Sequence, residues 1–360
     1  MNGKKVYIGM SGGVDSSVSA ALLKEAGADV TGVFIKVWQP DWMECTWRED
    51  RLDAMRVAAY LEIPFITLDL EQEYKKEVVD HMIAEYKSGR TPNPDIMCNS
   101  RVKFGAFFEW ALSQGADFVA TGHYARIEKD DASGGAFRLF SGVDLGKDQS
   151  YFLYALTQRE LSRTIFPVGG MEKSETRRLA RKFGLPVAEK RDSQGLCFIG
   201  KVDMKEFLSH YIPRKKGKAL DEQGNAVGEH DGAVFLTIGE RHGFSLSEKT
   251  PNDEPRYVVG RNIRKNTVTV SRKDPNGSLS SERKEYALKG ASWTLKEPIA
   301  GRRYAARIRH LGELVPCVVD ASDARAARIA FERPIAAAEG QSAVIYDGEE
   351  CLGGGTIAQI

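Results

Sequence analysis

The stretch from Val6 to Ala26 constrains the fold of this chain more than any other. An apolar run rich in β-forming residues ends at Ser11-Gly12-Gly13, and a helical pattern begins around Asp15. This order predicts a strand, a tight glycine turn and the first turn of a helix. Adjacent glycines let a ligand approach the backbone, and the unpaired N–H groups of a helix N-terminus favour an anion. Asp15 could hold a metal ion beside a phosphate.

An ordinary strand-to-helix turn is the alternative explanation for a Gly-Gly pair alone. The full string SGGVDS is more specific. It is not a Walker A loop, because no G-K-[ST] follows, and it lacks the spacing of the dinucleotide fingerprint. It resembles the pyrophosphate loop of the PP-loop ATP pyrophosphatases, which adenylate a carbonyl or carboxyl oxygen and release pyrophosphate. The loop therefore implies adenylation chemistry and leaves the substrate open.

Strands and helices alternate through the first 126 residues. Apolar β-rich segments at 30–38, 64–70 and 116–124 are separated by helical patterns at 48–61, 71–87 and 104–114. This pattern predicts an α/β fold with a doubly wound parallel sheet. Ligands of such sheets gather at the carboxyl ends of the strands, where Ser11–Ser17 and Thr121–Tyr124 would both lie. From Ala219 onward, short alternating segments between turn signals predict all-β modules.

The composition and the spacing of the cysteines indicate the cellular compartment of the protein. No run approaches the ~18 apolar residues of a membrane span, and a strand begins too early to leave room for a signal peptide. The five cysteines are widely spaced and form no CxxC pair, which argues against a disulfide framework and a structural zinc site. We therefore expect a cytoplasmic protein with no membrane contact and no dedicated metal ligands.

The charges are unevenly distributed, although the net charge is only +1. The segment Arg256–Arg309 contains 14 Lys and Arg against 4 Asp and Glu, whereas His310–Ile360 contains 3 against 8. A basic segment of this kind suggests a phosphate-rich partner. A solvated charged surface is the alternative.

Two of the cysteines lie in polar segments of the sequence. Cys98 follows Asn93-Pro94-Asp95, and Arg101 and Lys103 come within one turn of the helix expected after it. A helix N-terminus and nearby cations lower a thiol pKa and favour the thiolate. Cys197 lies in the second polar loop, KRDSQGLCFIG. A buried structural role is the alternative for each, but two such cysteines in an ATP-activating fold suggest a persulfide and a resolving thiol.

Five motifs occur in order over about the first 200 residues: SGGVDS, TPNPDIMCN, GHYAR, KDQSYFL and DSQGLCFIG. Together they resemble the tRNA-uridine 2-sulfurtransferases, or tRNA-specific 2-thiouridylases, a family within the PP-loop superfamily. The resemblance implies an adenine nucleotide alpha hydrolase-like catalytic domain at 1–203, a small, mostly β central domain at 204–282 and a C-terminal β-barrel at 283–360.

The resemblance also implies site residues. Cys197 would carry the persulfide, and Cys98 would be the partner nucleophile. From its place three residues before Cys98, we take Asp95 as the candidate for proton transfer at the base. ATP would be bound by Gly9, Met10, Ser11, Gly12, Gly13, Val14, Asp15, Ser16, Ile35 and Gly122. tRNA would be contacted by Asn93, Pro94, Asp95, His123, Lys147, Asp148, Gln149, Arg309, His310 and Gln341.

The implied reaction is ATP-dependent 2-thiolation of the wobble uridine in the tRNA anticodon loop. Its cofactor would be ATP with Mg²⁺, and its sulfur would come from a relay protein or a cysteine desulfurase. Another PP-loop synthetase or ligase remains an alternative, although it would not need the two cysteines. A non-catalytic RNA-binding protein is a further alternative that leaves the nucleotide loop unexplained.

Overall fold

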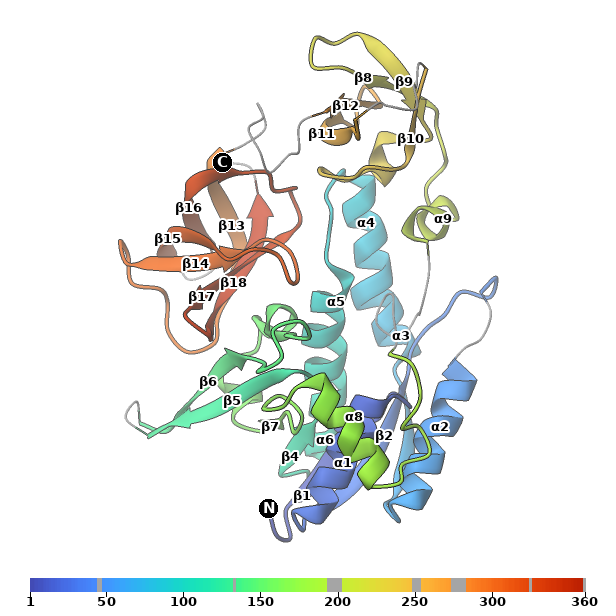
Figure 1. Ribbon diagram of the computed structural model, residues 1–360, viewed down its shortest axis with the longest axis vertical. Helices are drawn as coiled ribbons and strands as arrows, with labels where there is room; N and C mark the ends of the chain where they lie inside the picture. Colours follow the sequence, from blue (N-terminus) through green and yellow to red (C-terminus); the bar gives the residue numbers. More distant parts are fainter. Residues whose placement is uncertain are drawn as a thin grey trace.

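The computed structural model describes residues 1–43, 47–131, 134–192, 203–247, 254–272, 283–323 and 326–358. They form three sheets in three regions of the molecule (Figure 1). A parallel sheet lies near the N-terminus at the bottom of the view, a small sheet lies at the top, and a barrel lies to the left.

The parallel sheet carries the segment that opens the sequence. Its strands run in the order β3 (Phe65–Asp69), β2 (Asp29–Lys36), β1 (Lys5–Gly9), β4 (Phe118–Ala120) and β7 (Thr164–Ile165). Chain order reverses between β1 and β4, so the turn after β1 lies at the switch point where doubly wound sheets bind ligands.

Helices cover both faces of this sheet. One layer consists of α1 (Val14–Glu25), α2 (Trp47–Tyr60) and α8 (Lys173–Lys182). The other consists of α3 (Glu71–Tyr74), η1 (Lys75–Asp80), α4 (His81–Lys87), α5 (Pro94–Met97), η2 (Cys98–Phe107) and α6 (Phe108–Ser113). Val6 and Ile8 pack into the first layer and Tyr7 against the second, as strand alternation requires. The predicted doubly wound α/β fold is confirmed.

The helix after the proline-containing loop begins earlier than the sequence pattern predicts. We expected a helix from Phe104, but α5, η2 and α6 follow one another without a break from Pro94. Asn93 caps this helix, because its side-chain oxygen accepts from the N–H groups of Asp95 (3.1 Å) and Ile96 (3.2 Å). Pro94 fits the first helical position, where no N–H is needed. The expected position of Cys98 ahead of a helix is therefore wrong.

The small sheet belongs to the central part of the chain. Its strands run in the order β10 (Phe244–Leu246), β9 (Ala226–His230), β8 (Gly217–Leu220), β12 (Thr267–Ser271) and β11 (Tyr257–Asn262). Two short helices, α9 (Met204–Ser209) and η5 (Ala233–Phe235), accompany it. Trp42, from the tryptophan-rich segment after β2, stacks on His210 just after α9, with ring centroids 3.8 Å apart. That segment therefore packs the first region against the second.

The C-terminal strands close into a barrel, as the resemblance implies. They are β13 (Arg283–Trp293), β14 (Arg303–Arg307), β15 (Val315–Asp323), β16 (Ala326–Ile335), β17 (Ser342–Asp347) and β18 (Glu350–Ala358). Closure follows because β13 pairs with both β16 and β18.

A hairpin from the first half of the chain extends the barrel sheet. Its strands are β5 (Ala125–Asp130) and β6 (Ala136–Ser141), and β6 pairs with β18. The sequence pattern did not predict these strands. Helices η4 (Ser150–Leu153) and α7 (Gln158–Leu161) follow the hairpin before the chain returns to β7.

Candidate functional site

The turn between β1 and α1 is shaped by its glycines and serines. Gly12 has φ +75°, and a Cβ there would lie 2.2 Å from the carbonyl oxygen of Asp50, so only glycine fits. The Ser16 hydroxyl lies 3.2 Å from both the Ser11 N–H and the Gly13 carbonyl oxygen. Ser17 donates to the same Gly13 carbonyl at 2.7 Å. These bonds fix the backbone just ahead of the helix N-terminus, the feature that favours an anion.

A second loop lies directly against this turn. A Cβ on Gly122 would be 2.6 Å from the backbone nitrogen of Ser16. The loop after β4 can therefore approach the start of α1 only because residue 122 is glycine. The structure thus brings together Ser11–Ser17 and Thr121–Tyr124, as expected from the carboxyl ends of adjacent strands. Met10 and Ile35 are buried in opposite layers beside the sheet.

Asp15 belongs to an ionic network that sequence reasoning missed. Its carboxylate accepts from the Lys173 ammonium at 2.6 Å and from the Tyr124 hydroxyl at 2.8 Å. Burial, and then the charge of Asp15, raises the pKa of Tyr124, which keeps its proton. Lys173 is the first residue of α8, a helix rich in charged residues. No local pattern marks this lysine.

Asp192 joins the same network from the other side. It accepts from Lys147 (2.8 Å), Lys173 (2.9 Å) and Arg177 (2.6 Å). Partial burial alone would raise the pKa of Asp192, but the hydrogen bonds and charges of Lys147 and Lys173 hold it well below its ordinary value. Asp192 therefore stays ionised, and it shares one of these cations, Lys173, with Asp15.

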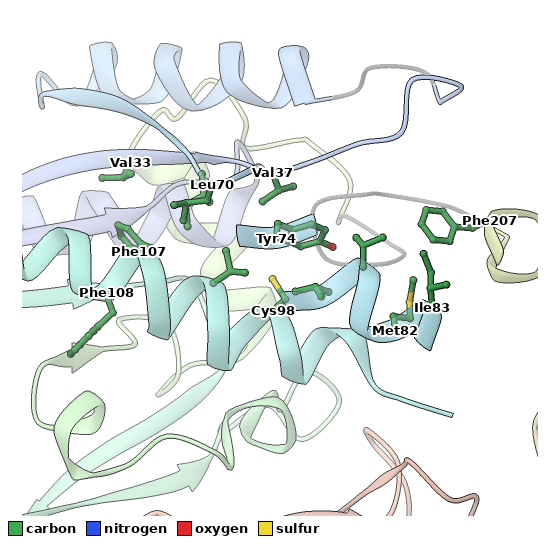
Figure 2. Close-up of a cluster of buried hydrophobic side chains, with 14 of the residues drawn as sticks. Val33, Val37, Leu70, Tyr74, Met82, Ile83, Cys98, Phe107, Phe108 and Phe207 are labelled. Carbon is green, nitrogen blue, oxygen red and sulfur yellow. The ribbon is translucent and has the colours of Figure 1, made fainter. Parts of the chain in front are cut away.

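Cys98 is completely buried in the second turn of its helix. Figure 2 shows it among apolar side chains that include Val37, Leu70 and Tyr74. Because Val37 follows β2 directly, Cys98 lies toward the carboxyl edge of the sheet, although its side chain faces the core. Cys197, the expected persulfide carrier, lies outside the described residues.

The residues expected to contact the target base begin the Cys98 helix. Asn93 uses its side-chain oxygen as the cap, and Pro94 occupies the first helical position. Asp95 is half-buried, and its carbonyl accepts from the Asn99 amide at 2.9 Å. All three residues are half-buried at this helix N-terminus.

His123 is buried beneath the second loop. Burial, and then the charge of Lys103, holds the pKa of His123 well below its ordinary value, so the ring is neutral. The Lys103 ammonium lies 3.4 Å from Nε2 and can only donate, whereas Thr121 Oγ1 lies 2.7 Å from Nδ1. The proton therefore belongs on Nδ1. Both ring nitrogens thus have partners within the protein, and the expected contact of His123 with tRNA stays a prediction.

The segment Lys147–Gln149 uses its side chains internally. Asp148 is fully buried and accepts from the Arg307 guanidinium of the barrel at 2.8 Å. The Gln149 side chain accepts from the Tyr124 N–H at 3.0 Å, and Lys147 binds Asp192. The Asp148 carboxylate therefore ties the first region to the barrel, and the expected contact of this segment with tRNA stays a prediction.

Three expected tRNA residues lie in the C-terminal half. Arg309 donates to the carbonyl of Ile238 at 3.2 Å, which links barrel and central sheet. His310 is half-buried with its ring 4.3 Å from that of Phe152, and burial lowers its pKa. Gln341 accepts from the N–H of Ala338 at 2.9 Å. Arg309 and His310 therefore lie at contacts between regions, whereas the Gln341 contact is local, and all three residues remain partly exposed.

Three family matches divide the chain. The tRNA methyl transferase HUP domain matches residues 4–201, the tRNA methyl transferase PRC-barrel domain matches 205–272, and the aminomethyltransferase beta-barrel domain matches 283–357. The fold and the loop after β1 define a protein of the PP-loop class.

Curated relatives identify the family within that class. A tRNA-specific 2-thiouridylase MnmA of Enterococcus faecalis is 44% identical over 359 residues, covering 98% of this chain and 95% of its own. One from Escherichia coli O1:K1 is 43% identical over 362 residues, covering 99% and 97%. The chain belongs to the tRNA-specific 2-thiouridylase MnmA family. A solved 4-thiouridine synthetase–RNA complex with bound ATP is only weakly similar, with 20% identity, a TM-score of 0.35 and coverage of 58% and 50%.

Two kinds of feature are absent from the described residues. In that part of the chain, no helix has both the length and the apolar character needed to cross a membrane. No group of three or more His, Cys, Asp or Glu side chains within it is arranged to hold a metal ion.

Proposed function

We propose that this protein catalyses the ATP-dependent 2-thiolation of the wobble uridine in tRNA. The observation that carries the proposal is the SGGVDS turn, built for an anion at the switch point of the sheet, in a chain that matches 2-thiouridylases along nearly its whole length. ATP would place its phosphates against Ser11–Ser16 at the N-terminus of α1, with Gly9 and Gly122 giving the nucleotide room.

Activation is the first chemical requirement. The C2 carbonyl oxygen of uridine is a poor leaving group, so it attacks the α-phosphorus of ATP and pyrophosphate departs. The helix N-terminus and the serine hydroxyls would stabilise the charge on the leaving phosphates. Asp15 is the carboxylate that fits Mg²⁺ here, since it already accepts from a cation and Mg²⁺ is usually held by one or two carboxylates together with phosphates.

Sulfur transfer is the second requirement. The terminal sulfur of a Cys197 persulfide would attack C2, and AMP would leave. The Cys98 thiolate would then attack Cys197 Sγ, which frees 2-thiouridine and leaves a Cys98–Cys197 disulfide. Alternatively, Cys98 attacks the persulfide first and releases hydrosulfide into the site. Both routes need the Cα atoms within about 4.4–6.8 Å at the moment of bridging. Because Cys98 is fully buried, both also require its helix to shift or a neighbouring side chain to swing away.

Partners and setting follow from this chemistry. A sulfur relay protein or a cysteine desulfurase would deliver the persulfide, and we expect the enzyme in the cytoplasm, since this chemistry needs reduced thiols. We assign catalysis to residues 1–203 and expect 204–282 and 283–360 to hold the tRNA. Asn93, Pro94 and Asp95 would meet the target base, with Asp95 as the proton-transfer group.

The test is mass spectrometry of tRNA nucleosides after incubation with ATP and a sulfur source. We expect 2-thiouridine together with AMP and pyrophosphate. Cys98→Ser and Cys197→Ser should each lose thiolation, by at least a hundredfold, while still binding ATP and tRNA. Cys351→Ser, at a buried cysteine of the barrel, is the matched control and should keep activity. Release of ADP and phosphate, or full single-turnover activity of either mutant, would contradict the mechanism.

A further inference from the structure

The ammonium of Lys173 is held beside the SGGVDS turn by contacts on several sides. It lies 2.6 Å from Asp15 Oδ1, 2.9 Å from Asp192 Oδ1 and 5.8 Å from the ring centre of Tyr124. The lysine backbone N–H donates to Asp144 at 3.0 Å, which fixes the start of α8. Only 12% of the side chain is exposed. The cation is therefore preorganised next to the N-terminus of α1.

The charge balance around Lys173 favours an anionic ligand. Lys147, Lys173 and Arg177 all pair with the Asp192 carboxylate, and Lys173 also pairs with Asp15. The nearby Asp144 carboxylate accepts from the Lys173 backbone N–H, so these three side-chain cations face two carboxylates. The unpaired N–H groups of α1 add positive potential beside them. A ligand with several negative charges could therefore bind here without leaving a buried charge unpaired.

We propose that Lys173 binds the β- and γ-phosphates of ATP, and the pyrophosphate released from it, by exchanging its contact with Asp15 for phosphate oxygens. An ammonium has three donors, so the bond to Asp192 can persist while another N–H turns to phosphate. The exchange also frees the Asp15 carboxylate for a cation bound with the phosphates. This inference rests on the proposed function, because it takes ATP as the ligand of the Ser11–Ser16 turn.

A purely structural role for Lys173 predicts a different result. If the lysine only neutralised Asp15, removing its charge would disturb the start of α1 and weaken every nucleotide alike. If it binds the outer phosphates, ATP and pyrophosphate lose affinity, whereas AMP, which lacks those phosphates, does not. The ratio of ATP affinity to AMP affinity therefore separates the two roles.

The experiment is calorimetric titration of the full chain with Mg-ATP, pyrophosphate and AMP. We expect Lys173→Met to raise the Kd for ATP and pyrophosphate about ten- to hundredfold, the usual range for a lost hydrogen bond to a charged group. AMP should change less than about twofold, and Lys173→Arg should recover part of the loss. Lys205→Met is the matched control, since Lys205 also pairs with an aspartate at 2.6 Å and is 31% exposed. It should leave all three affinities unchanged.

Equal weakening of AMP and ATP, or no weakening at all, would overturn the proposal. Thermal melting checks that the variants fold. If Lys173→Met does not fold, Lys173→Gln, which keeps a donor but no charge, supplies the same comparison. A wild type that binds ATP but never thiolates tRNA would overturn the proposed function and leave Lys173 as a phosphate ligand. If the wild type thiolates tRNA but the Lys173 variants keep its ratio of ATP affinity to AMP affinity, this inference is refuted and the proposed function is not.

Discussion

At the scale of single residues, Asp192 holds several cations beside the SGGVDS turn (Ser11–Ser16). Its carboxylate accepts from Lys147, Lys173 and Arg177. Partial burial alone would raise the pKa of Asp192, but the contacts with Lys147 and Lys173 hold it below the ordinary value. A carboxyl whose pKa is lower in the folded state stabilises the fold when it is ionised. That stabilisation is present above the unfolded pKa of about 3.9 and is lost as the pH falls toward the folded value.

Asp192→Asn should therefore reveal a pH-dependent contribution to stability. We expect the variant to unfold with about 1–3 kcal/mol less free energy than the wild type between pH 5 and 8, the range for hydrogen bonds to a charged group. The difference should shrink as the pH falls below about 4. Urea unfolding at several pH values measures it. Glu189→Gln is the control, because its pair with Arg181 is exposed and should contribute little. A pH-independent difference for Asp192→Asn would argue against the ion network.

At the scale of elements, the approach of the loop after β4 to α1 depends on one glycine. A side chain at residue 122 would collide with backbone atoms of Asp15 and Ser16, neither of which can move without distorting the helix N-terminus. The two chain segments therefore act as one unit, although they lie about a hundred residues apart.

Gly122→Ala should damage this unit while leaving the rest of the fold intact. We expect ATP affinity to fall about tenfold or more, since a Cβ at 2.6 Å from Ser16 forces the two segments apart. Gly170→Ala is the matched control, because nothing lies within 4 Å of a Cβ there. Calorimetric titration with ATP measures both variants. If Gly122→Ala and Gly170→Ala bind ATP equally well, the loop after β4 can move without disturbing the SGGVDS turn.

At the scale of the whole molecule, the basic segment Arg256–Arg309 is partly neutralised by the barrel itself. Arg302 pairs with Asp347 and Arg303 with Glu332. Both arginines remain at least half exposed, and such surface pairs contribute little to stability. They can therefore exchange a carboxylate for a phosphate at small cost.

Charge reversal at Arg302 and Arg303 should weaken tRNA binding and leave ATP binding unchanged. Loss of up to two phosphate contacts should reduce the slope of log affinity against log salt by about 1–2. Filter binding across a salt series measures this slope. Reversal of Arg178, an exposed arginine on α8 paired with Glu175, serves as a control at another surface. An unchanged slope would place the docking face elsewhere.

The sequence is sufficient to predict the parallel sheet and its helices, but not the contacts between distant segments of the chain. Strand and helix periodicity are local, so the parallel sheet, the glycine turn and the meeting of Ser11–Ser17 with Thr121–Tyr124 could be predicted. The early start of the Cys98 helix was missed because Asn93-Pro94 resembles a loop until its capping geometry is seen. The ion pairs of Lys173 and Asp148 were not predicted, because the partners of a charged side chain depend on contacts between distant segments.

The pairing of β6 with β18 bears on the order in which this chain can fold during synthesis. In this pairing Leu139 lies opposite Cys351 and Phe140 opposite Glu350. The buried Asp148 likewise pairs with Arg307, which is 159 residues later in the chain. The ribosome therefore releases the nucleotide-binding half with a strand edge uncovered and a buried carboxylate unpaired. Such contacts of high sequence separation form slowly and leave the nascent chain exposed to mispairing. The first half of the enzyme reaches its final structure only when nearly the last strand has been made.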